Sequence, residues 1–369
     1  MKMRYRYLRR IKGWLWLPFF LINLPAAFSA SPGGAHPFFI FESWTFSEPL
    51  PIYSVLNSLE GDDFEHGEIQ WTWNWIELGF KYEKWGISIV QRYDYDLRFS
   101  KDTAELFWRT KNKYPLPKGE KYKVFLEANS FHSTGIRFSF TDNFIESLNC
   151  TLGLSYLRAD HLIDGLINGN ATIINDSDYD FEAGVGYYYT EDILFDRKVN
   201  EPVGRGFSID AEFSWLFKNS TLMEMQVRDL FARIYWEDSP YTTGKATSDR
   251  KKYDENGYVS IDPVLSGYEG IESVHAQKLD PRWYLKLEHP LTEEFSFLAQ
   301  SRYQYGHGLF GLGCVVALGN RSRLSAGYWP LNHAVEIKYM KNRFELALSA
   351  DHTNIKKMRT FWISISLGV

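Results

Sequence analysis

The sequence predicts an all-β protein, namely a transmembrane antiparallel up-and-down β-barrel of about sixteen strands, within a range of roughly 14–18. Three observations predict this fold class. Apolar and polar residues alternate with a period of two in one segment after another from Ile69 onward. Aromatic residues make up 17% of the chain and are spread over its whole length. After residue 30, no apolar run reaches the 18 or so residues that a membrane-spanning helix needs.

Residues 1–29 are predicted to be a secretory signal peptide. Six basic residues and no acid precede the apolar core at 13–24 (GWLWLPFFLINL), and Ala27 and Ser29 place small residues at the −3 and −1 positions of a cleavage site. The mature chain would then begin near Ala30. The alternative is an uncleaved N-terminal anchor helix.

The charge balance argues against nucleic acid as a partner. The whole chain has 41 Lys and Arg and 46 Asp and Glu; without the six basic residues of the signal, 35 bases face 46 acids, a net charge of about −11. No metal or other cofactor is predicted. The stretch Asp254 to Gly257 (DENG) has its glycine at position four instead of the sixth position of an EF-hand loop, so a small hairpin with a type I′ turn is expected there.

Residues 30–68 are expected to form an irregular N-terminal lead-in or a plug, which leaves 69–369 as the barrel domain. This segment contains four prolines, and 38–46, for which a strand is the alternative, lacks a clean alternation. The predicted strands of the barrel are 69–82, 86–99, 103–111, 121–130, 135–141, 147–158, 178–190, 206–217, 222–236, 282–289, 294–305, 309–318, 322–329, 333–340, 343–351 and 359–369.

The predicted connections are of two kinds, short turns such as 341–342 and long polar loops such as 237–281. That loop has 45 residues, 14 of them charged, and is expected at the outer end of the barrel. Barrels of this kind have short turns at one end and longer loops at the other. Two consecutive predicted connections, 159–177 and 191–205, are both long, which breaks this alternation.

The last strand carries a resemblance to a known class. Apolar residues stand at every second position back from the C-terminus, at Val369, Leu367, Ile365, Ile363 and Phe361. This stretch resembles the C-terminal strand of Gram-negative outer-membrane β-barrels, and the pattern from Ile69 onward is similar to porin-class proteins. The resemblance implies an outer-membrane location, contact with outer-membrane lipid, recognition by the barrel assembly machinery, passive transport or export, and a potential homo-oligomer.

Polar faces of the predicted strands supply the candidate functional residues. If the apolar faces contact lipid, the opposite faces line the lumen and are predicted to set the selectivity of a pore for small polar solutes or saccharides. The predicted pore-lining residues are Arg92, Asp94, Asp96, Arg98, Arg109, Glu127, Arg137, Asp210, Glu212, Arg228 and Arg302. Charges of both signs also suit a closed lumen filled by ion pairs, which is the alternative.

Aromatic residues give two alternatives. Trp71, Trp73 and Trp75 share one strand face and are expected in the interfacial girdle of the membrane, with sugar stacking in the lumen as the alternative.

Other functions remain open at this point. His132 and Ser133 lie side by side, but neighbours on a strand point to opposite faces, so a polar turn is expected there and no enzyme. The rival functions are a barrel enzyme acting on lipid or polysaccharide, a non-conducting structural or surface-display barrel, and a soluble β-sandwich.

Overall fold

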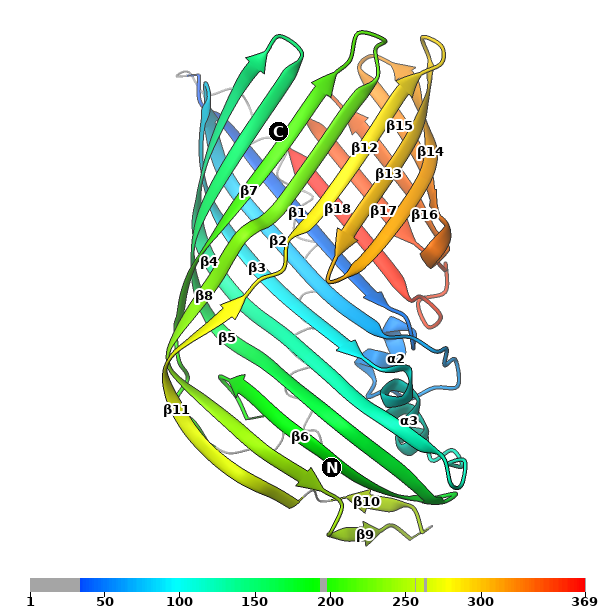
Figure 1. The fold of residues 1–369 in the computed structure, drawn as a ribbon. Helices are drawn as coiled ribbons and strands as arrows, with labels where there is room; N and C mark the ends of the chain where they lie inside the picture. Colours follow the sequence, from blue (N-terminus) through cyan, green and yellow to red (C-terminus); the bar gives the residue numbers. More distant parts are fainter. Residues whose placement is uncertain (1–33, 193–197, 256, 262–263, 369) are drawn as a thin grey trace.

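The sheet of the protein closes on itself as a barrel (Figure 1). The computed structural model describes residues 34–192, 198–255, 257–261 and 264–368; the predicted signal peptide and Val369 lie outside this part of the chain. Sixteen antiparallel strands form one sheet, and fourteen of them make the closed ring, namely β1 to β5, β7, β8 and β12 to β18. Strands β6 and β11 extend the sheet at one end of the ring. The all-β antiparallel barrel is therefore confirmed.

The elements follow one another along the described chain with these bounds: β1 (His36–Ser47), α2 (Ile52–Leu56), β2 (Ile69–Tyr82), β3 (Trp85–Phe99), α3 (Lys101–Asn112), β4 (Lys121–Ile145), β5 (Leu148–Asn175), β6 (Asp178–Tyr189), β7 (Gly204–Leu216), β8 (Leu222–Thr247), β9 (Lys251–Tyr253), β10 (Val259–Ile261), β11 (Val264–Lys278), β12 (Arg282–Pro290), β13 (Phe295–Gln304), β14 (His307–Gly319), β15 (Ser322–Trp329), η3 (Pro330–Asn332), β16 (Ala334–Lys341), β17 (Phe344–Ala350) and β18 (Thr360–Leu367).

The two ends of the ring differ, as expected. Hairpin turns such as the one between β2 and β3 lie at one end, which we call the short-turn end; both α2 and α3 lie at the other, the loop end (Figure 1). The long connection predicted at 159–177 is wrong, because β5 continues to Asn175 and pairs there with β6; of the two, only 191–205 is a connection, and it joins β6 to β7. The alternation of short and long connections is therefore preserved.

The expected lead-in or plug at 30–68 contains a wall strand instead. Strand β1 pairs with β18 on one side and with β2 on the other, so it closes the ring. Its alternation is obscured because Trp44 and Phe46 on the inward face are apolar too. The barrel begins at His36 and not at Ile69. The C-terminal strand β18 is paired on both edges, as the hazard of a free edge predicts.

The strand predicted at 103–111 is a helix, α3. Ser100 caps its start by accepting a hydrogen bond from the backbone N–H of Thr103 at 3.2 Å, and Lys113 ends it in the left-handed region at a φ of 58°. The helix lies along the edge of β4 beyond the last residue of β3. Asp102 and Thr103 accept hydrogen bonds from the backbone N–H groups of Lys123 and Phe125 at 2.8 and 2.9 Å. Helix α3 thus protects a strand edge that would otherwise be free.

Replacing Ser100 with Ala is expected to loosen α3 by about 1 kcal/mol, because the first turn loses its side-chain cap. Hydrogen exchange of the α3 amides should become faster, while the ring strands keep their protection. Ser100→Thr, which retains the capping hydroxyl, is the control. Equal exchange rates in the Ala variant and the parent protein would contradict the capping role.

Two further differences concern strand lengths. Strand β4 runs without interruption through the polar turn expected at 129–135, with a β-bulge at His132 and Ser133. The expected loop 237–281 contains the end of β8 and all of β11, which pair with each other. The small hairpin predicted within it is confirmed as β9 and β10. The sheet has sixteen strands in total, because one helix and one split strand offset the two sheet strands that were missed; the closed ring has fourteen, the lower end of the predicted range.

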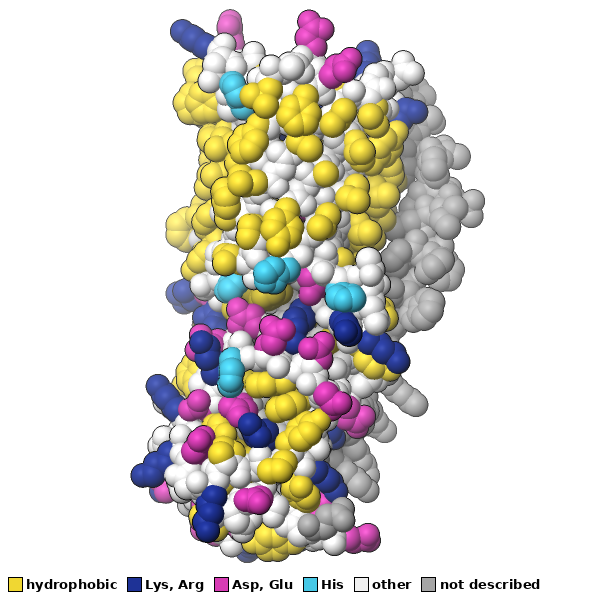
Figure 2. Space-filling view, turned by 90° about the vertical axis from the view of Figure 1, so that its right-hand side faces the viewer, with side chains coloured by type: hydrophobic (Ala, Val, Ile, Leu, Met, Phe, Trp, Pro, Cys, Tyr) yellow, Lys and Arg dark blue, Asp and Glu magenta, His cyan; other side chains and the backbone are white. Residues whose placement is uncertain are grey.

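An apolar band surrounds the short-turn half of the barrel. Figure 2 shows hydrophobic side chains over the upper half of the visible face, bordered below by Lys, Arg, Asp, Glu and His. Ile87 and Ile89 on β3 are 50% and 61% exposed, and Phe138 and Leu154 on the next two strands are 54% and 52% exposed. Further along β3 the outward face is covered, and Phe99 is buried. The band therefore ends partway along β3, and the strands continue beyond it.

Candidate functional site in the barrel interior

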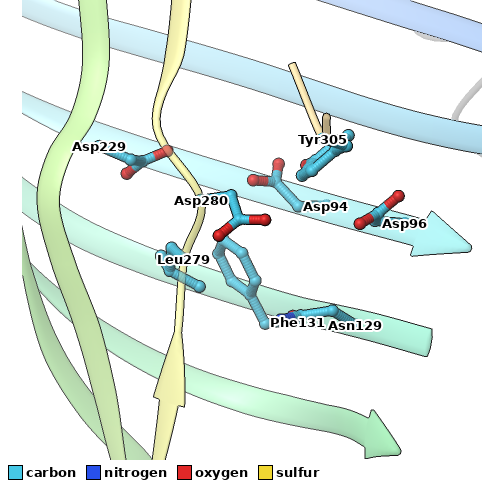
Figure 3. Close-up of a pocket in the computed structure, with 8 residues that line it drawn as sticks. All are labelled: Asp94, Asp96, Asn129, Phe131, Asp229, Leu279, Asp280 and Tyr305. Carbon is cyan, nitrogen blue, oxygen red and sulfur yellow. The ribbon is translucent and has the colours of Figure 1, made fainter. Parts of the chain in front are cut away.

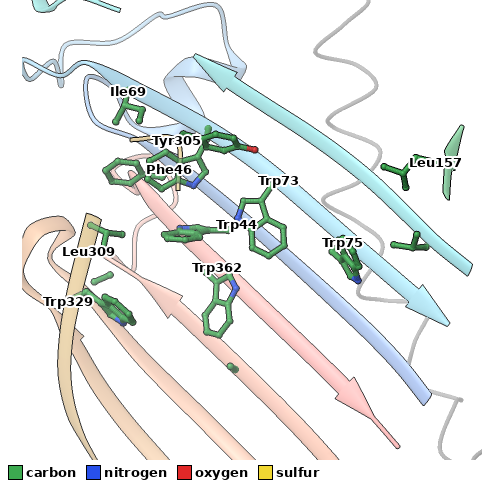
Figure 4. Close-up of a cluster of buried hydrophobic side chains, with 14 residues drawn as sticks. Trp44, Phe46, Ile69, Trp73, Trp75, Leu157, Tyr305, Leu309, Trp329 and Trp362 are labelled. Atoms are coloured by element: carbon green, nitrogen blue, oxygen red, sulfur yellow. The ribbon is translucent and has the colours of Figure 1, made fainter. Parts of the chain in front are cut away.

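Tryptophan side chains fill the middle of the lumen. Trp71, Trp73 and Trp75 of β2 are 0%, 7% and 1% exposed and belong to a buried cluster with Trp44 and Trp362 (Figure 4). The expected place of the three β2 tryptophans in the interfacial girdle is therefore wrong. This part of β2 has the polar Thr72 and Asn74 on its other face, so the inward face is the more apolar one.

Arginines from the opposite wall lie against these rings. Trp362, Trp44 and Trp73 are direct cross-strand neighbours on β18, β1 and β2. The Arg302 guanidinium lies 4.0 Å from the Trp362 ring centroid, and that of Arg228 lies 4.1 Å from the Trp75 ring centroid. These are cation–π distances, at which a ring partly replaces the water that a buried cation has lost.

Four charged side chains meet across the lumen beside this cluster. Arg92 donates to both carboxylate oxygens of Asp229 at 2.7 Å each and to Asp94 at 2.8 Å. Arg282 donates to Asp229 at 2.9 Å and lies 3.3 Å from Asp94. We call Arg92, Asp94, Asp229 and Arg282 the lumen partition. Their side chains are 1–6% exposed and come from β3, β8 and β12, so the partition joins opposite walls.

An irregularity in β8 places Asp229 in the partition. The register between β7 and β8 shifts at Ile209, and Asp229 has a φ of +57°, a conformation that Asp adopts more readily than most residues. Its backbone N–H donates to Asp210 at 3.1 Å, and the Ser208 hydroxyl donates to its carboxylate at 2.8 Å. The bulge turns a side chain inward that regular alternation would direct outward.

A vestibule of about 380 Å³ lies between the partition and the short-turn end. Charged side chains of both signs line it together with the aromatic rings. Its acids have their own cationic partners: Glu224 lies 2.8 Å from Lys286, Glu345 lies 2.9 Å from Lys338, and Glu212 lies 3.8 Å from Arg137.

On the loop-end side of the partition, a cavity of only about 10 Å³ adjoins it, about the space of one water. Figure 3 shows its lining, in which Asp94 and Asp96 lie near Tyr305 and Asp229 lies farther away, on the other side of Asp280.

The predicted pore-lining residues divide into three groups. Buried inside the barrel are Arg92, Asp94, Asp96, Arg137, Asp210, Arg228 and Arg302, and Glu212 lines the vestibule. Arg98 and Glu127 lie at the loop end, 3.8 Å apart. Arg109 is the exception: it lies on α3, not on a strand, and pairs with Glu105 at 2.6 Å. Whether the inward residues line a conducting pore stays a prediction.

Two residues of the partition were missing from the prediction. Arg282 has the same parity as the inward Tyr284 and Lys286, so alternation along the predicted strand would have identified it. Asp229 directly follows the inward Arg228, so strand alternation predicts that its side chain points outward. Only the bulge in β8 explains its position.

His132 and Ser133 lie on opposite faces of β4. The His132 ring nitrogens lie 2.6 Å from Asp160 and 3.1 Å from Gln91, and the Ser133 side chain is fully buried. The pair thus lacks the contact between nucleophile and base that hydrolysis requires.

Strand pairing defines the protein as a closed antiparallel β-barrel with a partitioned lumen. No helix among the described residues is long and apolar enough to cross a membrane. No protein-family model matches the chain, and no curated protein sequence is significantly similar to it.

Several solved structures show a weak likeness to this chain. The toluene transporter TodX of P. putida is 11% identical, with 95% of this chain and 93% of that chain covered and a TM-score of 0.42. The Ralstonia pickettii toluene transporter TbuX is 8% identical over 90% and 88% of the two chains, with a TM-score of 0.31. The Escherichia coli outer-membrane transporter YddB is 8% identical over 89% and 55%, with a TM-score of 0.20. The fold assignment therefore rests on the strand pairing of this chain.

Proposed function

We propose that the protein is a channel in the outer membrane of a Gram-negative bacterium, described here in a closed form, for the passage of small polar solutes. The apolar band of the short-turn half supports a membrane location, since apolar outward residues are what lipid favours. Strand β1 begins and strand β18 ends at the short-turn end, which would face the periplasm. Strand β18 retains the alternation that would serve recognition by the assembly machinery.

One observation carries this proposal: the polar vestibule ends at a partition built from side chains. Arg92, Asp94, Asp229 and Arg282 are anchored on wall strands and meet through ion pairs. Side chains change rotamer without rearrangement of the sheet, so an open form requires only that these four separate. The aromatic rings beside the vestibule would also suit stacking against a sugar ring. Such stacking in the lumen is the alternative stated for Trp71, Trp73 and Trp75.

The double substitution Arg92→Ala with Asp94→Ala is expected to open the lumen. It removes one charge of each sign and leaves Arg282 paired with Asp229 at 2.9 Å, so the charge balance of the partition is kept. Single-channel recording in planar bilayers should show little or no current for the parent protein and a stepwise conductance for the double variant.

The control is Arg205→Ala with Glu237→Ala. This ion pair at 3.0 Å is also removed without net charge change, but its side chains are 61% and 64% exposed on the outer surface. It should behave like the parent protein. If the Arg92 and Asp94 variant is folded and silent, the channel proposal fails and a structural or surface-display barrel becomes the better description.

A further inference from the structure

We infer that the blind end of the vestibule is a binding site for an oxyanionic group, that is, a carboxylate, phosphate or sulfate. The site consists of Arg228, Arg282, Gln304 and Trp73, which all line the vestibule. The inference rests on the proposed channel function for its biological meaning, because it names the class of solute that enters. Its physical basis lies in the side chains themselves.

Two buried arginines face each other in this site. Arg228 on β8 and Arg282 on β12 are direct cross-strand partners and are 7% and 6% exposed. Like charges directly opposite each other on a sheet are destabilising, the more so where water is excluded. Both guanidinium groups lie against Trp73, at 5.8 and 4.9 Å from its ring centroid. A bound anion between them would turn this repulsion into two charge-assisted contacts.

Hydrogen-bond donors without a protein acceptor gather in the same site. Among the described residues, Arg228 Nη1, Arg282 Nε, Gln304 Nε2 and Trp73 Nε1 are buried and have no hydrogen-bond partner, whereas Arg282 Nη1 lies 3.3 Å from Asp94. All of these atoms donate. Buried polar atoms are normally paired, because an unpaired one has lost its hydrogen bonds to water without replacement. A ligand rich in acceptor oxygens can accept hydrogen bonds from these donors, and a ligand that carries only donor groups cannot.

The nearby carboxylates do not occupy all of these donors. Arg228 has an ion pair with Glu42 at 3.2 Å, and Arg282 is shared between Asp229 and Asp94. The Glu42 contact engages Nη2 of Arg228 and leaves Nη1 unpartnered. The remaining vestibule acids are held by Lys286, Lys338 and Arg137, as described above. The unpartnered donors therefore point to a ligand from outside the chain.

Isothermal titration calorimetry on the refolded full chain in detergent tests this site. The titrants are inorganic phosphate, sulfate and acetate, each in a low-chloride buffer. We expect saturable binding of at least one of them, and at least about tenfold weaker binding to Arg228→Gln, which removes a charged donor. Arg205→Gln, the same change at the 61% exposed outer arginine, should bind like the parent protein. Comparison of the three titrants shows whether a phosphate-like or a carboxylate group is preferred.

A second variant covers the case in which Arg228→Gln does not fold. Trp73→Phe keeps an aromatic ring and all charges but removes the indole N–H, and it should also weaken binding. The inference is overturned if no titrant binds to the parent protein, or if the folded site variants bind as tightly as the parent. Binding in detergent does not require conduction, so silence of the folded Arg92→Ala and Asp94→Ala double variant, with intact anion binding by the parent protein, refutes the channel alone. Conduction without anion binding refutes the site alone.

Discussion

Asp229→Asn is expected to destabilise the barrel by about 3–5 kcal/mol, the typical cost of removing one partner from a buried ion pair. Asp229 is the acceptor shared by Arg92 and Arg282, and it is 1% exposed. After the substitution, two buried arginines share the single carboxylate of Asp94. Asn retains the shape of the side chain and also tolerates a positive φ. The loss of stability therefore measures the effect of the charge alone.

Asp238→Asn is the matched control for this prediction. Asp238 lies on the same strand β8, also has a positive φ, of 52°, and is exposed. Its replacement should change the free energy of unfolding by less than about 0.5 kcal/mol. Urea unfolding of both variants in the same detergent, followed by tryptophan fluorescence, gives the comparison. Equal stabilities of the two variants would show that the partition is not a stabilising network.

Ile89→Arg is expected to cost about 2–4 kcal/mol on folding into lipid bilayers, because it places a cation on the lipid face of the apolar band. Ile89 is 61% exposed and points away from the lumen. In a solvent-exposed sheet the same change would be nearly neutral, since an exposed arginine keeps its water. The size of the effect therefore distinguishes a membrane barrel from a soluble β-protein.

Ile271→Arg supplies the matched comparison. Ile271 on β11 is 63% exposed and pairs with Pro240. Strand β11 extends the sheet toward the loop end (Figure 1), away from the short-turn half that carries the apolar band. The same residue type at nearly the same exposure should therefore tolerate the charge. Folding yields in phospholipid vesicles of defined thickness measure both variants. A large penalty at both positions, or at neither, would contradict the position of the band.

Arg282 belongs to both the lumen partition and the proposed anion site, and it has different partners in each. Arg282 is held by Asp229 and Asp94 in the partition and also faces Arg228 in the vestibule. An anion that binds between the two arginines would compete with these carboxylates for the guanidinium of Arg282. Under the two proposals above, the solute itself would weaken the partition and favour the open form.

The sequence alone determined the wall of the barrel. Alternation with a period of two is a local property, and it placed β2, β3 and most of β12 to β18 close to their observed bounds. The same parity placed Arg92, Asp94, Arg137 and Arg302 inside the barrel. Strand β18 is paired on both edges, which avoids the free edge that an alternating C-terminal strand would otherwise present.

Only the tertiary structure decided the features that depend on a neighbour. Helix α3 forms where the edge of β4 needs a partner, and a nine-residue alternation could not distinguish it from a strand. Strand β1 was missed because its inward face carries tryptophan, which packs against arginine from the opposite wall. The inward turn of Asp229 arises from a register shift between β7 and β8. A period-two pattern reports which face a residue occupies, whereas the closed lumen depends on which residues meet across it.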